Sequence, residues 1–229
     1  MQSEPINILT IQFANEISQK EIPLFRGAVL RSMGNNANLL FHNHTGKDTF
    51  RYAYPLIQYK RIRGKASLVC IGEAANIVGQ FLASCNGTFK IGEREVEFNT
   101  SRVLPARLFV QTWENLFHYH ISYWLPFNSK NYQLYQNTNG LVERTVLLEN
   151  ILKGNLLSML KGLNIHIEKD LLLKITQLSE PYILYNKGVG MTAFNADFMC
   201  NLTIPNNVGI GKNASIGFGV VYHNRKETT

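Results

Sequence analysis

The chain has 229 residues, enough for two modest domains of roughly 100 residues each or for one larger domain. Apolar residues make up 45% of the chain and no low-complexity tract interrupts it, which excludes a disordered protein and indicates a real core. The formal charge of +7 favours an acidic partner, nucleic acid first and an anionic membrane second.

The first hundred residues alternate between strand and helix patterns. Residues 6–13 are almost continuously apolar, which is typical of a buried central strand. Apolar residues at helical spacing follow Pro23, and this predicted helix ends at residues 34–36. Then come predicted strands at 52–62 and 65–71, a helix to about residue 84, and a hairpin at 88–91 and 94–98. The order β-α-β-β-α-β is typical of a ferredoxin-like domain.

A similar pattern begins again beyond Pro105, without any detectable repeat of the actual residues. It predicts a strand at 116–125, a long amphipathic helix over 141–159, and strands at 182–187, 192–204 and 216–222. We therefore predict an α+β protein of two tandem ferredoxin-like domains with antiparallel sheets, residues 1–104 and 105–229. The second domain carries a glycine-rich loop near its end.

Targeting and cysteine patterns point to an intracellular protein. The start of the chain lacks the features of a secretory signal, and no run of about 18 apolar residues could cross a bilayer. The three cysteines, Cys70, Cys85 and Cys200, are scattered singly, without the spacing of a metal site. We expect reduced thiols in a cytoplasmic protein with no bound metal and no cofactor.

Two histidines one residue apart, His42 and His44, precede a basic, tyrosine-rich stretch at residues 51–65. Imidazole both accepts and donates protons near neutral pH, and neighbouring cations attract phosphate. If residues 42–44 are extended, both imidazoles lie on one face, whereas on a helix they would diverge. The pattern favours acid/base chemistry on a polyanion.

Other interpretations of the histidines compete with this one. The string H-N-H also occurs in metal-dependent nucleases, but the further downstream ligands of such a site are missing, and the histidines could merely cap a loop. A second pair, His118 and His120, fits the polar outer face of a sheet better than an RNA-stacking surface.

Cations and glycines supply candidate phosphate contacts. One cluster, Lys60, Arg61, Arg63 and Lys65, is either a solvated hairpin or a phosphate-binding one. Two Gly-apolar-Gly triplets near the end of the chain allow close backbone approach to phosphate, and a lysine lies between them. These residues are Gly209, Gly211, Lys212, Gly217 and Gly219. The same stretch fits a dinucleotide fingerprint only weakly, because no strand-helix-strand unit follows.

The doubled glycine pattern resembles the signature loop of the RAMP proteins. The sequences FHNH at 41–44, RYAYPLIQYK at 51–60 and WLPFNSKNY at 124–132 narrow the resemblance to the CRISPR-associated repeat endoribonucleases, b-like branch of the sixth Cas family. The resemblance covers essentially the whole chain. It implies cleavage of CRISPR precursor RNA once per repeat, without metal, by attack of the ribose 2′-hydroxyl. The products would carry a 2′,3′-cyclic phosphate and a 5′-hydroxyl.

In such a reaction His42 and His44 would divide the roles of base and acid, each typically worth roughly 10² to 10⁴ in rate. Tyr52 could orient the 2′-hydroxyl or donate to the phosphate, and Arg51 or Lys60 could stabilise charge on the phosphate oxygens. The expected partners are CRISPR repeat RNA, as precursor and as mature guide, and proteins of a CRISPR effector complex, with no membrane. The sequence leaves open a homodimer. It also leaves open a RAMP-type subunit that holds guide RNA without cutting it.

Overall fold

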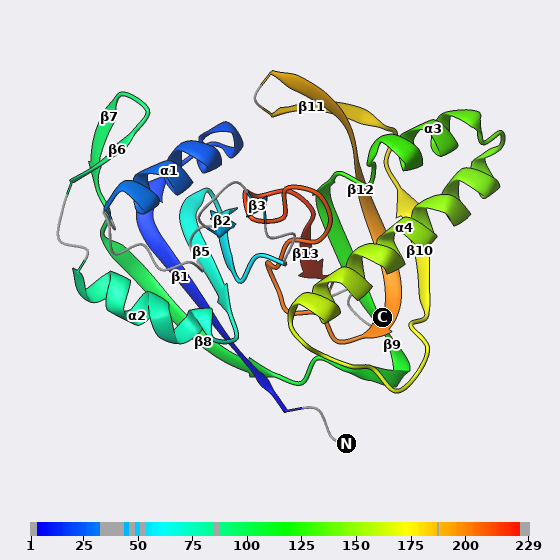
Figure 1. The fold of residues 1–229 in the computed structure, drawn as a ribbon, viewed down its shortest axis with the longest axis horizontal. Helices are drawn as coiled ribbons and strands as arrows, with labels where there is room; N and C mark the ends of the chain where they lie inside the picture. Colours follow the sequence, from blue (N-terminus) through cyan, green and yellow to red (C-terminus); the bar gives the residue numbers. More distant parts are fainter. Residues whose placement is uncertain are drawn as a thin grey trace. The chain divides into compact units, whose positions relative to one another are not determined.

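The computed structural model describes residues 4–32, 44–45, 49–50, 54–84, 88–186 and 188–224, with backbone alone at 44–45, 49–50 and 80–84. It divides into two compact units, each built around its own sheet (Figure 1). The N-terminal unit comprises residues 4–109 together with 215–217, and the C-terminal unit comprises 110–214 and the residues from 218 onwards. Within the described part of the chain, no helix combines the length and apolar character needed to cross a bilayer.

The N-terminal unit is a four-stranded antiparallel sheet in the order β4-β5-β1-β8. Two helices connect its strands, and two small hairpins accompany them. The elements are β1 (Ile6–Glu16), η1 (Gln19–Glu21), α1 (Ile22–Ser32), β2 (His44–Thr45), β3 (Thr49–Phe50), β4 (Ile57–Ile62), β5 (Lys65–Ile71), α2 (Ala74–Ser84), β6 (Thr88–Ile91), β7 (Arg94–Glu97) and β8 (Thr100–Leu108). This is the strand order of a ferredoxin-like domain, with β1, β4, β5 and β8 as its four strands.

An aromatic cluster fills the space between this sheet and α1. Phe25 of α1 is fully buried, and its ring lies 5.8 Å from Phe13 on β1 and 5.7 Å from Tyr59 on β4. Ile11 and Leu68, opposite each other on β1 and β5, are also fully buried. Because side chains alternate along a strand, burial of Tyr59 on this face places its neighbour on the other face.

The C-terminal unit repeats the same topology. Its main sheet has the order β10-β12-β9-β13, all antiparallel, and β11 extends β12 as a hairpin that reaches beyond the sheet (Figure 1). The elements are β9 (Thr112–Trp124), α3 (Ser129–Asn137), α4 (Leu141–Gly162), β10 (Leu173–Leu178), β11 (Tyr182–Asn186), β12 (Val189–Leu202) and β13 (Val220–His223). Its core places Leu152 and Leu156 of α4 with Tyr119 and Phe198 of the sheet.

One element of the usual ferredoxin-like order is replaced in this unit. Residues 203–219, all of which the structure describes, contain no helix between β12 and β13. The glycine-rich stretch occupies that connection instead. The predicted fold class, two ferredoxin-like units with antiparallel sheets and a glycine-rich loop, is therefore confirmed.

Several details differ from the sequence-based expectations. The last strand of the N-terminal unit is β8, whereas the sequence patterns predict the hairpin at 88–98 in that place. Since β8 runs through Pro105, the units divide after Phe109, later than the expected boundary. The helix α3 and the strand β10 were also missed, and the strand expected from residue 216 begins only at Val220.

Candidate nucleic-acid interface and catalytic segment

The predicted catalytic residues lie in the connection between α1 and β4. His44 begins the short strand β2, which pairs with β3 through His44 and Phe50, so the backbone there is extended. Three other predicted residues, His42, Arg51 and Tyr52, lie outside the described residues. The extended backbone at His44 is the conformation that the spacing of the histidine pair favours.

Three of the four predicted cations surround the turn between β4 and β5. Arg63 and Gly64 both have positive φ, at 50° and 84°, as in the tight turns that match the twist of a hairpin. The Nε of Arg61 donates a hydrogen bond to the Ile17 carbonyl at 2.7 Å, which anchors the hairpin to the end of β1. Arg61 and Arg63 are exposed and Lys65 is half-buried. This turn therefore presents a cluster of positive charge to solvent.

Lys60 lies apart from this cluster. Its side chain is fully buried, and burial lowers the pKa of its ammonium group to about 7. Across the sheet it stands opposite Ser67, which in turn stands opposite Gln12, and both of these are buried polar residues. Lys60 thus belongs to a row of buried polar side chains. We expected it to lie on the same solvent-facing surface as Arg61, Arg63 and Lys65, and its buried position does not fit that expectation.

The glycine-rich loop is closely packed, and two of its glycines lie where a side chain would collide with a neighbour. Gly219 has φ of 59°, and a Cβ on it would stand 1.9 Å from the backbone oxygen of Ile210. Gly217 has φ of 86°, and a Cβ there would stand 2.4 Å from Cδ1 of Ile22 in the N-terminal unit. Gly209, Gly217 and Gly219 are buried, whereas Gly211 is half-buried and Lys212 is exposed. The solvent-facing part of the loop is therefore at residues 211–213.

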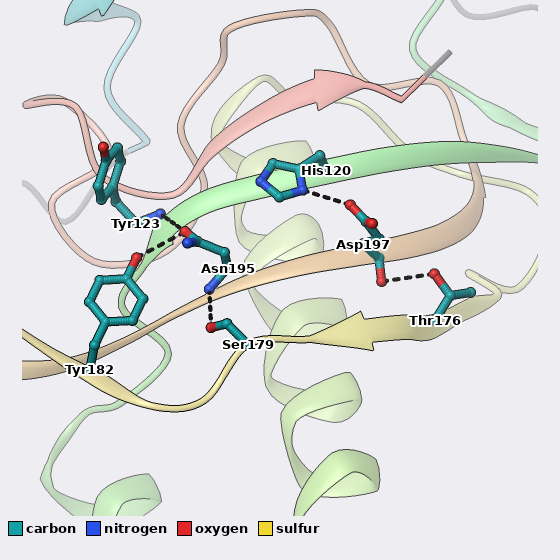
Figure 2. Close-up of polar contacts among 7 residues, drawn as sticks. All are labelled: His120, Tyr123, Thr176, Ser179, Tyr182, Asn195 and Asp197. Atoms are coloured by element: carbon teal, nitrogen blue, oxygen red, sulfur yellow. Dashed lines mark hydrogen bonds and ion pairs between the residues drawn. The ribbon is translucent and has the colours of Figure 1, made fainter. Parts of the chain in front are cut away.

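The second histidine pair lies on β9, as the alternation predicts. Tyr119 and Ile121 are fully buried, while His118 is exposed and His120 half-buried. Figure 2 shows the His120 ring pointing along the sheet toward Asp197 on β12, with 2.6 Å between Nδ1 and Oδ1. His120 is therefore part of a polar pair on the face of the sheet, and no local pattern predicts its partner because Asp197 is distant along the chain.

A second polar network in Figure 2 joins β9 to the β11 hairpin. Asn195 on β12 accepts two hydrogen bonds at Oδ1, one from the Tyr123 backbone N–H and one from the Tyr182 hydroxyl, each 2.9 Å long. Its own backbone N–H donates to Oγ of Ser179 at 2.9 Å. Tyr123 has φ of 53°, which marks a local irregularity of β9 at this point. The network fixes the base of the hairpin to the sheet.

A pocket of about 350 Å³ opens beside this hairpin. Its walls come from the segment before α3, from α3 itself, from the β11–β12 hairpin and from the glycine-rich loop through Lys212. Six of the lining side chains are aromatic or aliphatic, and four are polar: Asn128, Ser129, Thr192 and Lys212. Among the residues that the structure describes, no three His, Cys, Asp or Glu side chains gather closely enough to hold a metal ion.

Two tandem ferredoxin-like units, with a glycine-rich loop in place of the last helix and cations on an exposed hairpin, define a tandem ferredoxin-like protein with a cationic surface. The chain belongs to the Cas6b family. The family model of the Cas6b N-terminal domain matches residues 4–108, and that of the Cas6b C-terminal domain matches residues 111–224.

Two solved Cas6b structures and one curated protein are similar to this chain. A crystal structure of Cas6b matches 96% of this chain and 100% of its own, with a TM-score of 0.87 at 27% identity. The crystal structure of a CRISPR RNA processing endoribonuclease Cas6b has the same coverages, with a TM-score of 0.73 at 26% identity. An uncharacterized protein of Methanocaldococcus jannaschii is 38% identical over 109 residues, which span 47% of this chain and 73% of that protein.

Proposed function

We propose that this protein is an endoribonuclease that cuts CRISPR precursor RNA within its repeats and thereby releases guide RNA. The observation that carries the proposal is the match of both units to the Cas6b family, together with the likeness to a Cas6b that processes CRISPR RNA. The charge of +7 and the exposed cations of the β4–β5 turn suit a polyanionic substrate.

The proposed reaction needs no metal ion. The ribose 2′-hydroxyl before the cut attacks the scissile phosphate, and the bond to the 5′-oxygen of the next nucleotide breaks. One of His42 and His44 removes the 2′-proton, and the other donates a proton to the departing 5′-oxygen. The products are a 2′,3′-cyclic phosphate and a 5′-hydroxyl, so the proton balance closes within the histidine pair. Tyr52 orients the 2′-hydroxyl, and Arg51 stabilises the charge on the phosphate oxygens.

The RNA would be held by contacts that lie outside the reacting centre. Arg61, Arg63 and Lys65 approach its phosphates from the β4–β5 turn, and Lys212 does so from the glycine-rich loop. Gly211 allows the backbone beside Lys212 to come close to the RNA. The buried glycines 209, 217 and 219 contribute to RNA binding indirectly, because they set the shape of the loop. Buried Lys60 also contributes indirectly, because it belongs to the sheet that carries the β4–β5 turn. The partners in the cell would be repeat RNA and proteins of a cytoplasmic effector complex.

The test uses end-labelled repeat RNA from the CRISPR locus of the same genome, with EDTA present throughout. A second RNA carries a single 2′-deoxy nucleotide at the cut site. We expect one cut per repeat with the first RNA and none with the second, because the deoxyribose lacks the nucleophile. The double variant His42→Ala/His44→Ala should bind the RNA and lose the cut.

A matched control replaces two exposed histidines of the C-terminal unit, His118 and His166, by alanine. This variant should cut like the original protein, since neither residue has a place in the proposed reaction. Cleavage that requires a divalent metal would refute the mechanism. Tight binding of the repeat without any cut would replace the proposal by a subunit that holds guide RNA.

A further inference from the structure

The pocket beside the β11–β12 hairpin, which we call the Lys212 pocket, has the composition of a site for a flat, partly apolar ligand. Its lining includes Phe127, Tyr132, Ile183 and Met191 as apolar walls, with Asn128 and Lys212 as polar groups. Its volume of about 350 Å³ lies at the lower end of the ~300–1,000 Å³ that small-molecule sites usually have. The pocket is therefore sized for one small ring system.

The aromatic wall is fixed from behind and open in front. The Phe127 ring lies 4.8 Å from Tyr135 and 6.0 Å from Phe194, both of which are buried in the C-terminal core. The Tyr132 ring packs edge-on against Phe127, with their centroids 5.7 Å apart, while 42% of Tyr132 stays exposed. A rigid ring with an exposed face is what a stacking partner needs.

The opposite wall is apolar and unusually exposed for a β-hairpin. Ile183 on β11 is 54% exposed and Val189 at the start of β12 is 62% exposed. The Asn195 network described above holds the base of this hairpin to β9, so the wall keeps its position relative to Phe127. Exposed apolar surface at a pocket rim is typical of a ligand site.

The polar groups fit a nucleotide. Lys212 is exposed, and the backbone that carries it is constrained, since Gly211 has φ of 82° and a Cβ there would stand 2.8 Å from Oδ1 of Asn155. Asn128 accepts a hydrogen bond from the Asn131 backbone N–H at 2.8 Å, so its Nδ2 group is the part that can donate to a ligand. A cation next to a stacking surface matches the phosphate and the base of one nucleotide.

We infer that the Lys212 pocket binds one unpaired nucleotide of the RNA, with its base against Tyr132 and Phe127 and its phosphate at Lys212. The inference rests on the proposed function for the identity of the ligand as RNA. An unpaired nucleotide is required, because only a base that has left a duplex presents both its ring faces to aromatic side chains. The pocket would thus distinguish an unpaired nucleotide from one held in a duplex.

The experiment measures binding of repeat RNA that carries the 2′-deoxy nucleotide at the cut site, so that cleavage does not interfere. 2-Aminopurine replaces each unpaired base in turn, because its fluorescence reports stacking. We expect one position to change fluorescence on binding. Tyr132→Ala should abolish that change and weaken binding by roughly 5- to 150-fold, the range for loss of one base–aromatic contact, whereas Tyr132→Phe should keep both.

Two further variants sharpen the result. Tyr185 is 74% exposed on β11 but does not line the pocket, so Tyr185→Ala is a matched control that should leave the signal intact. Lys212→Gln should keep the stacking signal and reduce the slope of log affinity against log salt by about 0.7, the value for one phosphate contact with a single strand.

The outcomes separate the two proposals. Equal effects of Tyr132→Ala and Tyr185→Ala would overturn the pocket in favour of a general apolar hairpin surface. Normal cleavage of unmodified RNA together with wild-type binding by Tyr132→Ala would overturn the pocket and leave the proposed function standing. Failure of the original protein to bind repeat RNA at all would overturn the proposed function.

Discussion

Replacement of the buried Lys60 by methionine tests the energetic consequence of an ammonium group inside the N-terminal sheet. Methionine keeps the length and the apolar stem of lysine and removes the charge. Burial lowers the pKa of Lys60 from its ordinary value of 10.5 to about 7. Between these two pH values, the Lys60 amine therefore carries a proton in the unfolded chain and has lost it in the folded chain.

The direction of the effect follows from proton linkage. Below pH 7 the ammonium is charged in both states, and the folded protein carries the whole cost of burying it, about 5 kcal/mol from the difference in pKa. As the pH rises from 7 toward 10.5, the folded state has already lost its proton while the unfolded state must still lose one. The cost shrinks over that window, so the lysine protein gains stability relative to the methionine variant.

The expected size of the change is set by the same two pKa values. Between pH 7.5 and pH 9.0 the stability difference between Lys60→Met and the original protein should fall by about 2 kcal/mol. Urea denaturation at four pH values in this range measures it. Tyrosines and cysteines that titrate in the unfolded chain affect both proteins equally and cancel in the difference.

A control variant replaces Lys90, which is exposed on β6. Its side chain stays in water before and after unfolding, so the stability difference between Lys90→Met and the original protein should be flat with pH. A flat difference for Lys60→Met as well would refute the reasoning, because it would mean that the folded protein holds a fully charged lysine at that position.

Two further pairs of substitutions test local features of the fold by thermal or urea denaturation. Gly219→Ala should lower the free energy of unfolding by at least about 2 kcal/mol, because the φ of 59° is left-handed and the new Cβ would stand 1.9 Å from the Ile210 oxygen. Gly154→Ala should raise the free energy of unfolding by about 0.5–1 kcal/mol, because Gly154 lies in the middle of α4 and its new Cβ would have nothing within 4 Å. Asn128→Ala removes the side-chain acceptor that caps α3 and should cost about 1 kcal/mol, while Asn128→Asp should keep most of it; an unchanged midpoint for Asn128→Ala would contradict the capping role.

Local patterns were sufficient for most of the fold. A characteristic pattern of apolar residues predicts the strand at 6–13 and the helix over 141–159. The dipeptide Arg63-Gly64 is a local turn signal between two strands. The strand β8 was missed because its pattern is not that of a half-buried strand: residues 100–107 are exposed in every position. It forms because β1 offers its free edge, which is a tertiary cause that the sequence of β8 does not contain.

The candidate site was only partly predictable for a similar reason. Local spacing is enough to single out His42 and His44, and whether they act as a pair stays a prediction. The pair of His120 and Asp197 depends instead on the register between β9 and β12, 77 residues apart, which no local pattern specifies. Likewise, Lys60 and Arg61 look equivalent in the sequence, but residues 57–60 of β4 are all buried, whereas Arg61 lies near the end of the strand beside the exposed turn.

The glycine-rich loop illustrates how a motif can act on a ligand without touching it. Gly219 lets the loop pass a position where any Cβ would collide with the backbone of Ile210, and Gly217 does the same beside Ile22. Residues 211–213 are a part of the loop that reaches solvent. Lys212 then meets the pocket wall made by α3 and the β11 hairpin. It follows that substitutions of the buried glycines should weaken RNA binding only as far as they unfold or displace the loop. Substitution of Lys212 should weaken binding in a fully folded protein, with the salt dependence of a lost phosphate contact.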